Sequence, residues 1–199
     1  MDSSSTKGKI LNAAIELFSE RGFDKVSMRD IAGMVGIKAA SIYNHFSSKR
    51  DILIFLYESY IREHRLGAPS IELPLRRLET EPIQKIILSL EYYWYPLSRE
   101  KLDRVMLIAS QRICQDEASE NFIKELFFDS IKAVWIPLLD RAVTLGKIEP
   151  IDIEAFTHLA AHHAFSAAAL KWTAMNVSKE QWNKNLSTLF LLLKSIDRE

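Results

Sequence analysis

Apolar side chains recur every three or four residues along almost the whole of this 199-residue chain, and this spacing constrains the fold more than any other feature. Such a period places the apolar side chains on one face of an α-helix. No stretch alternates convincingly with a period of two, which is the pattern of a half-buried strand. Glycine and proline, six of each, mostly fall between the periodic segments. The sequence therefore predicts an all-α fold.

Helix start and stop signals divide the first third of the chain into four predicted helices. Serine and threonine residues near the N-terminus can cap the first helix, and Gly22 ends it. Ser27 begins the second, where Asp30 opposes the positive end of the helix dipole, and Gly36 ends it. We expect the third helix over residues 38–46, and a fourth, capped by Ser47 or Ser48, from residue 49 to about 64.

The remainder of the chain predicts a linker followed by five longer helices. Gly67, Pro69 and Pro74 interrupt the helical pattern and mark the linker. The five helices are expected over residues 82–97, 101–115, 118–145, 153–175 and 179–195. A short N-terminal domain with a larger C-terminal partner fits this organisation and the length of the chain.

Charge and cysteine content restrict the class of protein. Basic and acidic residues number 26 each, but the first 50 residues carry eight basic against five acidic side chains. The excess of positive charge is therefore confined to the N-terminal part. Cys114 is the one cysteine, and no apolar run reaches the length of about 18–20 residues that a membrane span requires. We expect a cytoplasmic protein.

The second and third predicted helices have the form of a helix-turn-helix. Gly36 lies between Val35 and Ile37, where glycine permits a tight turn and the aliphatic neighbours pack the helices together. Short and polar side chains lie on the free face of the second helix of this motif, and such side chains suit a DNA groove. They are Lys38, Ala39, Ala40, Ser41, Asn44 and His45.

The N-terminal sequence resembles the tetracycline-repressor (TetR) family of transcriptional regulators. The resemblance rests on ILNAAIELF at 10–18, GF at 22–23, SMRDIA at 27–32 and VGIKAASIYNHFSSK at 35–49. It implies that Ser27, Tyr43 and Lys49 contact DNA phosphates, and that Lys38, Ala39, Ala40, Ser41 and Asn44 face the groove. A phenol hydroxyl, an ammonium group and helix N-terminal amides are all good phosphate partners.

The resemblance also implies a domain organisation and a function. Residues 4–64 are expected to form the DNA-binding domain, with the helix-turn-helix over 27–46, and residues 65–199 a ligand-binding and dimerisation domain. The expected function is that of a repressor, a homodimer that binds palindromic operator DNA and is released by a small-molecule effector. Neither enzymatic activity nor a cofactor is implied.

Several C-terminal residues are candidates for the wall of an apolar ligand cavity that carries a few polar groups. We select Tyr93, Trp94, Met106, Ser110, Gln111, Trp135 and His163. An aromatic stripe at helical spacing is more often plain core, so each of these residues has packing as the alternative interpretation.

The last two predicted helices are candidates for the dimer interface. A series of alanines, Ala160, Ala161, Ala164, Ala167 and Ala168, would let another helix approach closely. His158 and His162 have the i,i+4 spacing of two metal ligands, but no cysteine or carboxylate partner is indicated by spacing. We therefore expect no metal site.

Two other hypotheses are compatible with the sequence. One is a helical protein-interaction adaptor that has lost DNA binding. The other is an enzyme on a helical scaffold that uses His158, His162 and a carboxylate. The presence of Tyr43 and Lys49 disfavours the adaptor, and the lack of a nucleophile elbow, a phosphate loop or a complete metal-ligand set disfavours the enzyme.

Overall fold

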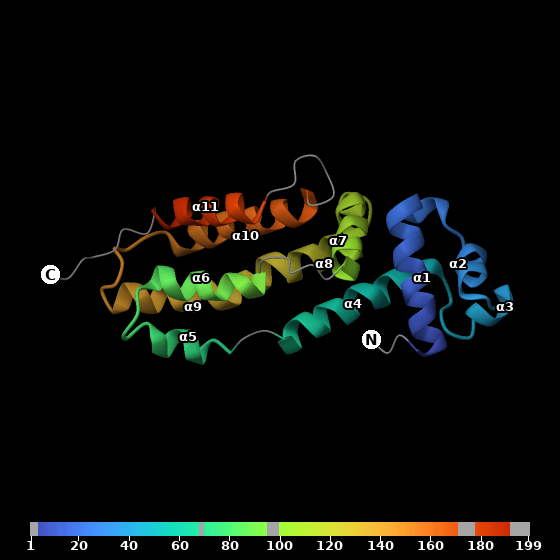
Figure 1. The fold of residues 1–199 in the computed structure, drawn as a ribbon, viewed down its shortest axis with the longest axis horizontal. Coiled ribbons are helices and arrows are strands. Elements are labelled where there is room, and N and C mark those ends of the chain that lie inside the picture. Colours follow the sequence, from blue (N-terminus) through green and yellow to red (C-terminus); the bar gives the residue numbers. More distant parts are fainter. Residues whose placement is uncertain (1–3, 68–69, 95–99, 171–177, 192–199) are drawn as a thin grey trace. The chain divides into compact units, whose positions relative to one another are not determined.

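The computed structural model describes residues 4–67, 70–94, 100–170 and 178–191. This described part of the chain consists of helices joined by turns, and none of it forms a β-strand. Figure 1 shows the helices in chain order, coloured from blue near the N-terminus to red near the C-terminus. The predicted all-α fold is confirmed.

The chain divides into two compact units. Unit 1 comprises Met1–Leu66 and Arg99–Ile123, and unit 2 comprises Gly67–Ser98 and Lys124–Glu199. Unit 1 thus joins the predicted DNA-binding segment to a later stretch that we expected to belong to the C-terminal domain. The functional boundary between residues 64 and 65 stays a prediction.

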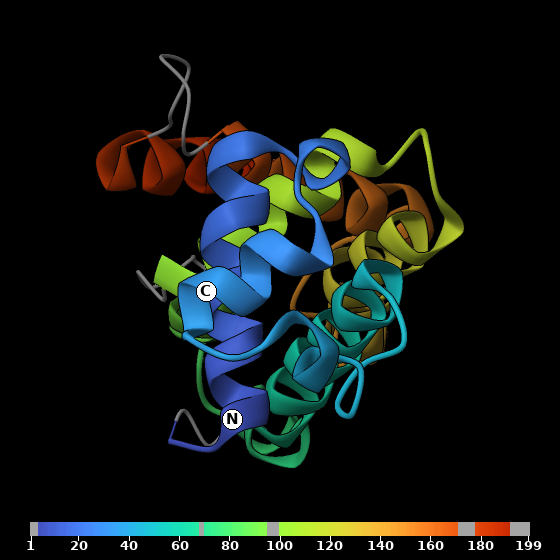
Figure 2. The same ribbon diagram turned by 90° about the vertical axis from the view of Figure 1, so that its right-hand side faces the viewer.

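Unit 1 contains six α-helices and one short 3₁₀ helix among its described residues. They are α1 (Thr6–Arg21), η1 (Phe23–Lys25), α2 (Met28–Val35), α3 (Ala39–Ile42), α4 (Lys49–Gly67), α7 (Glu100–Arg112) and α8 (Glu117–Ile123). Helix α1 packs against both α2 and α7, and α2 packs against α3. Figure 2 shows α2 and α3 in front of α1.

Local signals explain the limits of α1. The hydroxyl of Ser5 accepts a hydrogen bond from the Gly8 amide at 3.1 Å and caps the helix. Gly22 follows the last residue with a φ of 82°, which residues with a Cβ rarely adopt. The helix therefore ends where the sequence predicts. Its buried face supplies much of the core of unit 1, through Ile10, Leu11, Ala14, Ile15, Leu17 and Phe18.

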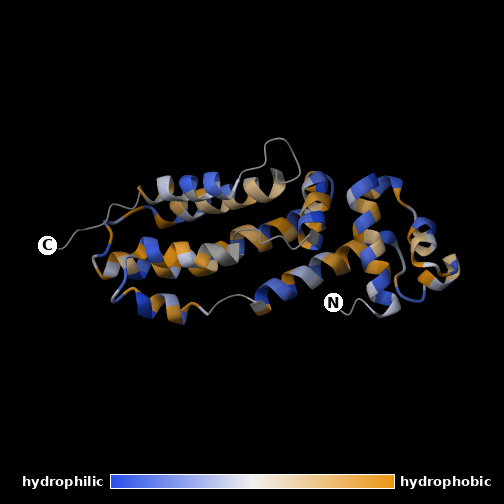
Figure 3. Cartoon of the chain, in the orientation of Figure 1, coloured by the Kyte–Doolittle hydropathy of each residue, from blue (hydrophilic) through white to orange (hydrophobic). Residues whose placement is uncertain are grey.

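Unit 2 contains the remaining described helices. They are α5 (Glu72–Arg77), α6 (Ile83–Trp94), the π-helical segment η2 (Lys124–Asp129), α9 (Ser130–Thr144), α10 (Ile153–Leu170) and α11 (Lys179–Phe190). Helices α9 and α10 pack along each other, and both contact η2. Figure 3 shows hydrophobic and hydrophilic residues sharing most of these helices, which is the amphipathic pattern of helices that pack on a core.

Two predicted boundaries in unit 2 are wrong. Residues around Pro74 were expected to be linker, but they form α5. Proline is tolerated there because the amides of a first helical turn have no intrahelical partner. The single helix expected over 118–145 is interrupted by η2. The sequence does not reveal this interruption, because the apolar spacing of a π-helical segment is close to that of an α-helix.

The alanine series of α10 has a different role from the predicted one. Ala160, Ala161, Ala164, Ala167 and Ala168 are all buried within the single chain. They lie on a helix that packs against α9, so their small size serves the packing of unit 2. The exposed positions of α10 include Ala155, His158, Leu159, His162 and Ser166. Among the described residues, no helix is long and apolar enough to cross a membrane.

Candidate nucleic-acid interface

Helix α2 begins at a capping box. The hydroxyl of Ser27 accepts from the Asp30 amide at 3.2 Å, and the Asp30 carboxylate accepts from the Ser27 amide at 2.8 Å and from its hydroxyl. The pKa of Asp30 is held below its usual value, first by the hydrogen bond from the Ser27 side chain and then by the bond from its backbone. The start of the helix-turn-helix is thereby fixed by two residues three positions apart.

The turn of the motif depends on Gly36. Its φ of 78° and ψ of 29° place it in the left-handed region, which glycine enters without steric cost. The Ile37 amide donates to the Ala32 carbonyl at 3.0 Å, which closes a Schellman-type end of α2. This bond turns the chain sharply into α3, as the sequence predicted.

Helix α3 is shorter than expected and ends at Ile42 instead of residue 46. The amide of His45 donates to the Ile42 carbonyl at 3.0 Å, a three-residue spacing that is tighter than an α-helix. Ile42 and Phe46 are buried and hold this segment against the rest of unit 1. Asn44 and His45 therefore project from a turn rather than from α3 itself.

The predicted groove-facing residues share one exposed surface around α3. Lys38, Ala39, Ala40, Asn44 and His45 are exposed, whereas Ser41 is half-buried. Tyr43 is 56% exposed although it is a large aromatic residue. An exposed tyrosine between the buried Ile42 and Phe46 presents its hydroxyl to solvent, which is the position that a phosphate contact requires.

The three residues expected to contact phosphate differ in their availability. Tyr43 presents an exposed side chain. Ser27 is also exposed, but its hydroxyl is engaged with Asp30. Lys49 is half-buried, and its ammonium group already has partners within the protein. The contacts of Ser27 and Lys49 with DNA stay predictions.

The ammonium group of Lys49 donates to three backbone carbonyls of unit 1. The acceptors are Phe23 at 2.8 Å, Asp24 at 3.2 Å and Val26 at 3.1 Å. An ammonium group has three hydrogens, so this set uses all of its donors. A direct bond from Lys49 to phosphate requires the exchange of at least one of them.

The start of α4 is capped in the manner of α2. Ser48 donates to the Asp51 carboxylate at 3.0 Å and accepts from the Asp51 amide at 3.1 Å, and Ser47 also donates to that carboxylate. Hydrogen bonds from the side chains of Ser47 and Ser48 hold the pKa of Asp51 below its usual value. Of the two predicted caps, Ser48 makes the amide bond.

The predicted ligand residues are distributed over both units. In unit 1, Met106 is buried, Ser110 is half-buried and Gln111 is exposed. In unit 2, Trp135 is buried and His163 is half-buried. The side chains of Tyr93 and Trp94 lie outside the described residues.

Three of these candidates carry buried polar atoms. Ser110 Oγ, Trp135 Nε1 and His163 Nε2 have no hydrogen-bond partner among the described residues. The ring of His163 stacks on Trp182 with centroids 4.5 Å apart, and burial lowers the pKa of His163. The imidazole of His163 and the indole N–H of Trp135 are therefore buried polar groups of unit 2.

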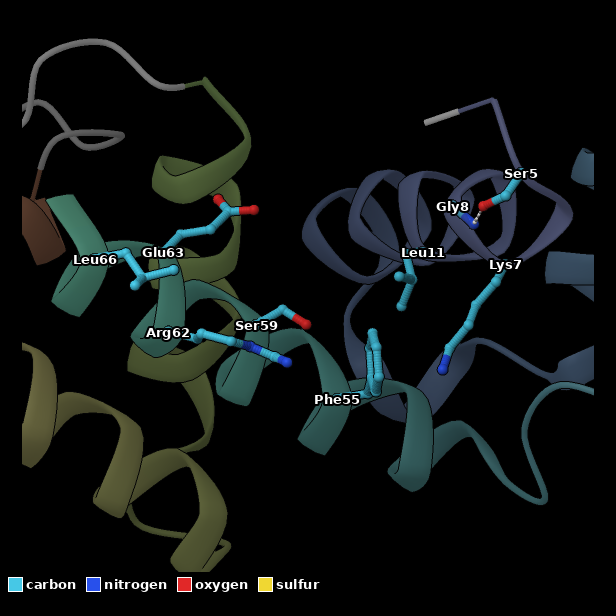
Figure 4. A pocket seen from close by; sticks show the side chains of 9 residues that line it. All are labelled: Ser5, Lys7, Gly8, Leu11, Phe55, Ser59, Arg62, Glu63 and Leu66. Carbon is cyan, nitrogen blue, oxygen red and sulfur yellow. Dashed lines mark hydrogen bonds between the residues drawn. The ribbon is translucent and has the colours of Figure 1, made fainter. Parts of the chain in front are cut away.

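One groove on the described surface lies away from these candidates. This groove, shown in Figure 4, has a volume of about 330 Å³ and lies in unit 1 along α1 and α4. Leu11 and Phe55 form its apolar part, and Lys7 extends from α1 toward Phe55, with its Nζ 3.8 Å from the ring centroid. None of the predicted ligand residues lines this groove.

The histidine pair of α10 is exposed and lies beside an aromatic side chain. The ring centroids of His162 and Phe128 are 4.9 Å apart, and His162 Nδ1 lies 2.8 Å from the carbonyl oxygen of His158. Among the described residues, no group of three or more histidine, cysteine, aspartate or glutamate side chains could hold a metal ion.

These features define the class of the molecule: an all-helical protein with an N-terminal helix-turn-helix whose second helix presents an exposed face. Residues 10–54 match the family described as bacterial regulatory proteins, tetR family. This segment of the chain is therefore similar in sequence to the TetR family.

A curated relative and two solved structures extend this comparison. The biofilm operon icaADBC HTH-type negative transcriptional regulator IcaR of Staphylococcus aureus (strain Newman) is 54% identical over 46 residues, which are 23% of this chain and 25% of that protein. The match thus spans about a quarter of the relative's length.

The likeness to solved structures covers nearly the whole chain but at low identity. A bacterial regulatory protein in the tetR family from Rhodococcus RHA1 has a TM-score of 0.72 and 14% identity, and the comparison covers 97% of this chain and 99% of that one. A protein from Saccharomonospora viridis, described as a transcriptional regulator in complex with choline, has a TM-score of 0.71 and 17% identity over 98% and 100% of the two chains. These likenesses show the fold.

Proposed function

We propose that this protein is a transcriptional repressor that binds palindromic operator DNA as a homodimer and is released by a small-molecule effector. The observation that carries the proposal is the exposed, mostly small and polar face around α3, held between the buried Ile42 and Phe46. The name of the S. aureus relative, which is a negative regulator and is 54% identical over 46 residues, supports the choice of repression.

The proposed DNA contacts divide into two kinds. Tyr43 and the amides at the N-terminus of α2 bind phosphates and fix the position of the protein on the duplex. Lys38, Ala39, Ala40, Ser41 and Asn44 face the edges of the bases, with His45 beside them. In a dimer the two copies of α3 enter successive major grooves about 34–36 Å apart.

The effector is proposed to bind in the C-terminal part of the chain. The buried polar atoms of Trp135 and His163 support a ligand with hydrogen-bonding groups and an apolar body. The choline in the S. viridis protein supports a small organic molecule as a class of ligand for this fold. The effector acts through its different affinity for the DNA-binding and free conformations. The dimer is proposed to form through α10 and α11, and the protein to act in the cytoplasm.

Selection of bound duplexes from a random DNA pool tests the proposal. A palindrome with half-sites about 10 base pairs apart, or a multiple of that spacing, is expected. Failure to enrich any sequence contradicts DNA-directed regulation and favours the adaptor. Sedimentation of the purified protein tests the homodimer, and a stable monomer contradicts it.

Two substitutions separate positioning contacts from base contacts. Lys49→Ala is expected to weaken binding to all duplexes. If the ammonium group exchanges onto phosphate, the variant should also lower the salt slope, which is the slope of log affinity against log salt concentration, by about one unit. Asn44→Ala is expected to change which bases are selected without changing that slope. An unchanged slope for Lys49→Ala would show that this lysine keeps its bonds to the backbone carbonyls, and it would contradict the phosphate contact.

A further inference from the structure

Two cations lie over one aromatic ring at the entry to the helix-turn-helix. Lys49 Nζ lies 4.4 Å from the ring centroid of Phe23, and the guanidinium carbon of Arg112 lies 4.1 Å from it. Both distances fall within the range of cation–π attraction. Lys49, at the start of α4, and Arg112, at the end of α7, therefore meet on the Phe23 ring of η1, although Arg112 is far from η1 in the sequence.

Contacts at the end of η1 connect Lys49 to the start of α2. Val26 is buried and directly precedes Ser27, the capping residue of α2. The carbonyl of Val26 is one of the three acceptors of Lys49. A change in the position of η1 thus moves the capping residue of α2 and the first residue of α4 together.

Arg112 holds η1 through a second set of contacts. Its guanidinium group donates to the Asp24 carboxylate at 3.3 Å and, through Nε, to the Asp116 carboxylate at 2.8 Å. The side chain of Arg112 is 14% exposed and that of Asp116 is 8% exposed, whereas Asp24 is largely exposed. The bond to Asp116 is therefore the better shielded from solvent.

The network continues from Asp116 to the middle of α4. The hydroxyl of Ser119 donates to Asp116 at 3.1 Å, because a carboxylate only accepts, and it lies 2.9 Å from the hydroxyl of Tyr57. Since Ser119 has one hydroxyl hydrogen, Tyr57 must be the donor in their bond. Burial alone would raise the pKa of Asp116, but the bonds from Ser119 and Arg112 outweigh it and hold that pKa below its usual value.

The Arg112 network is the set of Phe23, Asp24, Lys49, Tyr57, Arg112, Asp116 and Ser119. It reaches α4 at two points, Lys49 and Tyr57, and it reaches the start of α2 through η1. We propose that Arg112 is a positioning residue for DNA binding: from the corner between α7 and α8 it fixes α2 and α4 in the register that presents α3 to the duplex. This inference rests on the proposed function, because it assumes that α3 binds DNA.

The test measures operator affinity and its salt dependence. The probe is a fluorescently labelled duplex that carries the sequence selected from the random pool, titrated by anisotropy between about 50 and 200 mM salt. Arg112→Met keeps an apolar stem but removes the charge and the hydrogen bonds. It is expected to weaken binding about tenfold, with an unchanged salt slope because no phosphate contact is lost.

Two further variants keep this result interpretable. Arg112→Lys retains a cation for the Phe23 ring but lacks the planar fork that reaches both Asp24 and Asp116, so its affinity is expected between those of the wild type and Arg112→Met. Lys101→Met removes an exposed positive charge from the same helix and is expected to bind like the wild type. Hydrogen exchange of the amides of residues 28–46 is expected to rise in Arg112→Met and not in Lys101→Met.

The outcomes separate this inference from the proposed function. Wild-type affinity in Arg112→Met, or unchanged exchange over residues 28–46, overturns the inference. A salt slope lowered by about one unit makes Arg112 a phosphate contact and overturns it as well, as does an equal loss in Lys101→Met. A wild-type protein that binds no selected duplex contradicts the proposed function, and the exchange comparison then decides by itself whether Arg112 orders the motif.

Discussion

The helix-turn-helix and unit 2 are stabilised in different ways. In the helix-turn-helix and at the start of α4, hydrogen bonds between residues three to five positions apart fix each bend: Ser27 with Asp30, Ile37 with Ala32, and Ser48 with Asp51. In unit 2, ring contacts join distant residues, such as Phe127 with Phe165 and Trp135 with Phe156.

This difference shows which part of the chain tolerates variation. A local bond requires particular residue types at a fixed spacing, because caps and left-handed turns have few chemical solutions. Apolar packing accepts many combinations of similar total volume. We therefore expect substitutions in the helix-turn-helix to change DNA binding directly, and substitutions in the core of unit 2 to change mainly stability.

The largest effect is expected from buried aliphatic residues, one in each region. Ile42→Ala and Leu139→Ala each remove a side chain that is fully buried, so each should cost about 2–5 kcal/mol of folding free energy. Urea unfolding measures this cost. Ile42→Ala should also abolish DNA binding, whereas folded Leu139→Ala should bind with wild-type affinity. Loss of affinity in both variants would contradict the distinction between the regions.

A smaller effect is expected at the exposed face of the motif. Tyr43→Phe removes one hydroxyl, and the loss of its hydrogen bond to a charged phosphate should weaken operator binding about tenfold. Stability should not change, since Tyr43 is 56% exposed. Tyr60→Phe, at a buried position of α4, provides the control for the loss of a phenol hydroxyl. Equal affinity of Tyr43→Phe and wild type would remove the phosphate contact from the proposal.

Two glycines three positions apart test the local turn. Gly36→Ala should destabilise the protein by about 1–2 kcal/mol, because φ is 78° there although nothing lies within 4 Å of the added Cβ. Gly33→Ala, inside α2 with equally open space, should stabilise it by about 0.5–1 kcal/mol. Thermal melting of the two variants should thus give shifts of opposite sign. Shifts of the same sign would show that the left-handed conformation of Gly36 does not determine the loss of stability in Gly36→Ala.

The smallest effect is expected from the pH dependence of the capping box. The pKa of Asp30 is lowered in the folded protein, so the stability that it contributes is present above the unfolded pKa and is lost as the pH falls through the folded pKa. Asp30→Asn should therefore lower stability slightly near neutral pH, where the carboxylate contributes, and the two proteins should converge at acidic pH, where Asp30 is protonated. Denaturant titrations at several acidic pH values measure it, and an identical pH profile for both proteins would show that Asp30 is not responsible.

The accuracy of the sequence predictions follows the same division. The ends of α1 and α2 were predicted at Gly22 and Gly36 because single residues with unusual backbone freedom mark them. The exposed Tyr43 beside the buried Ile42 followed from helical periodicity and the family resemblance. Helix α5 and the π-helical η2 were not predicted. Pro74 indicated a linker and the continuous apolar spacing indicated one long helix, but tertiary packing overrides such local signals.

The role of Arg112 had no signal in the sequence. A guanidinium group on a helix face is most often a solvated surface residue, and its partners Phe23 and Asp24 lie almost 90 positions away. The three carbonyl acceptors of Lys49 had no signal in the sequence either, and the family resemblance implied that this lysine is directed toward DNA. The buried alanines of α10 were likewise predicted to face a partner because spacing does not reveal which neighbour covers a small residue.

The amino-acid sequence by itself determined the helical class, the position of the helix-turn-helix and most of its boundaries, because caps, glycine turns and amphipathic periods act over a few residues. The tertiary structure decided which side chains each helix covers, how α7 and α8 join the N-terminal unit, and where the charged groups of Arg112 and Lys49 are directed. Those choices depend on contacts between residues far apart in the chain, whose free energies exist only when the whole unit has folded.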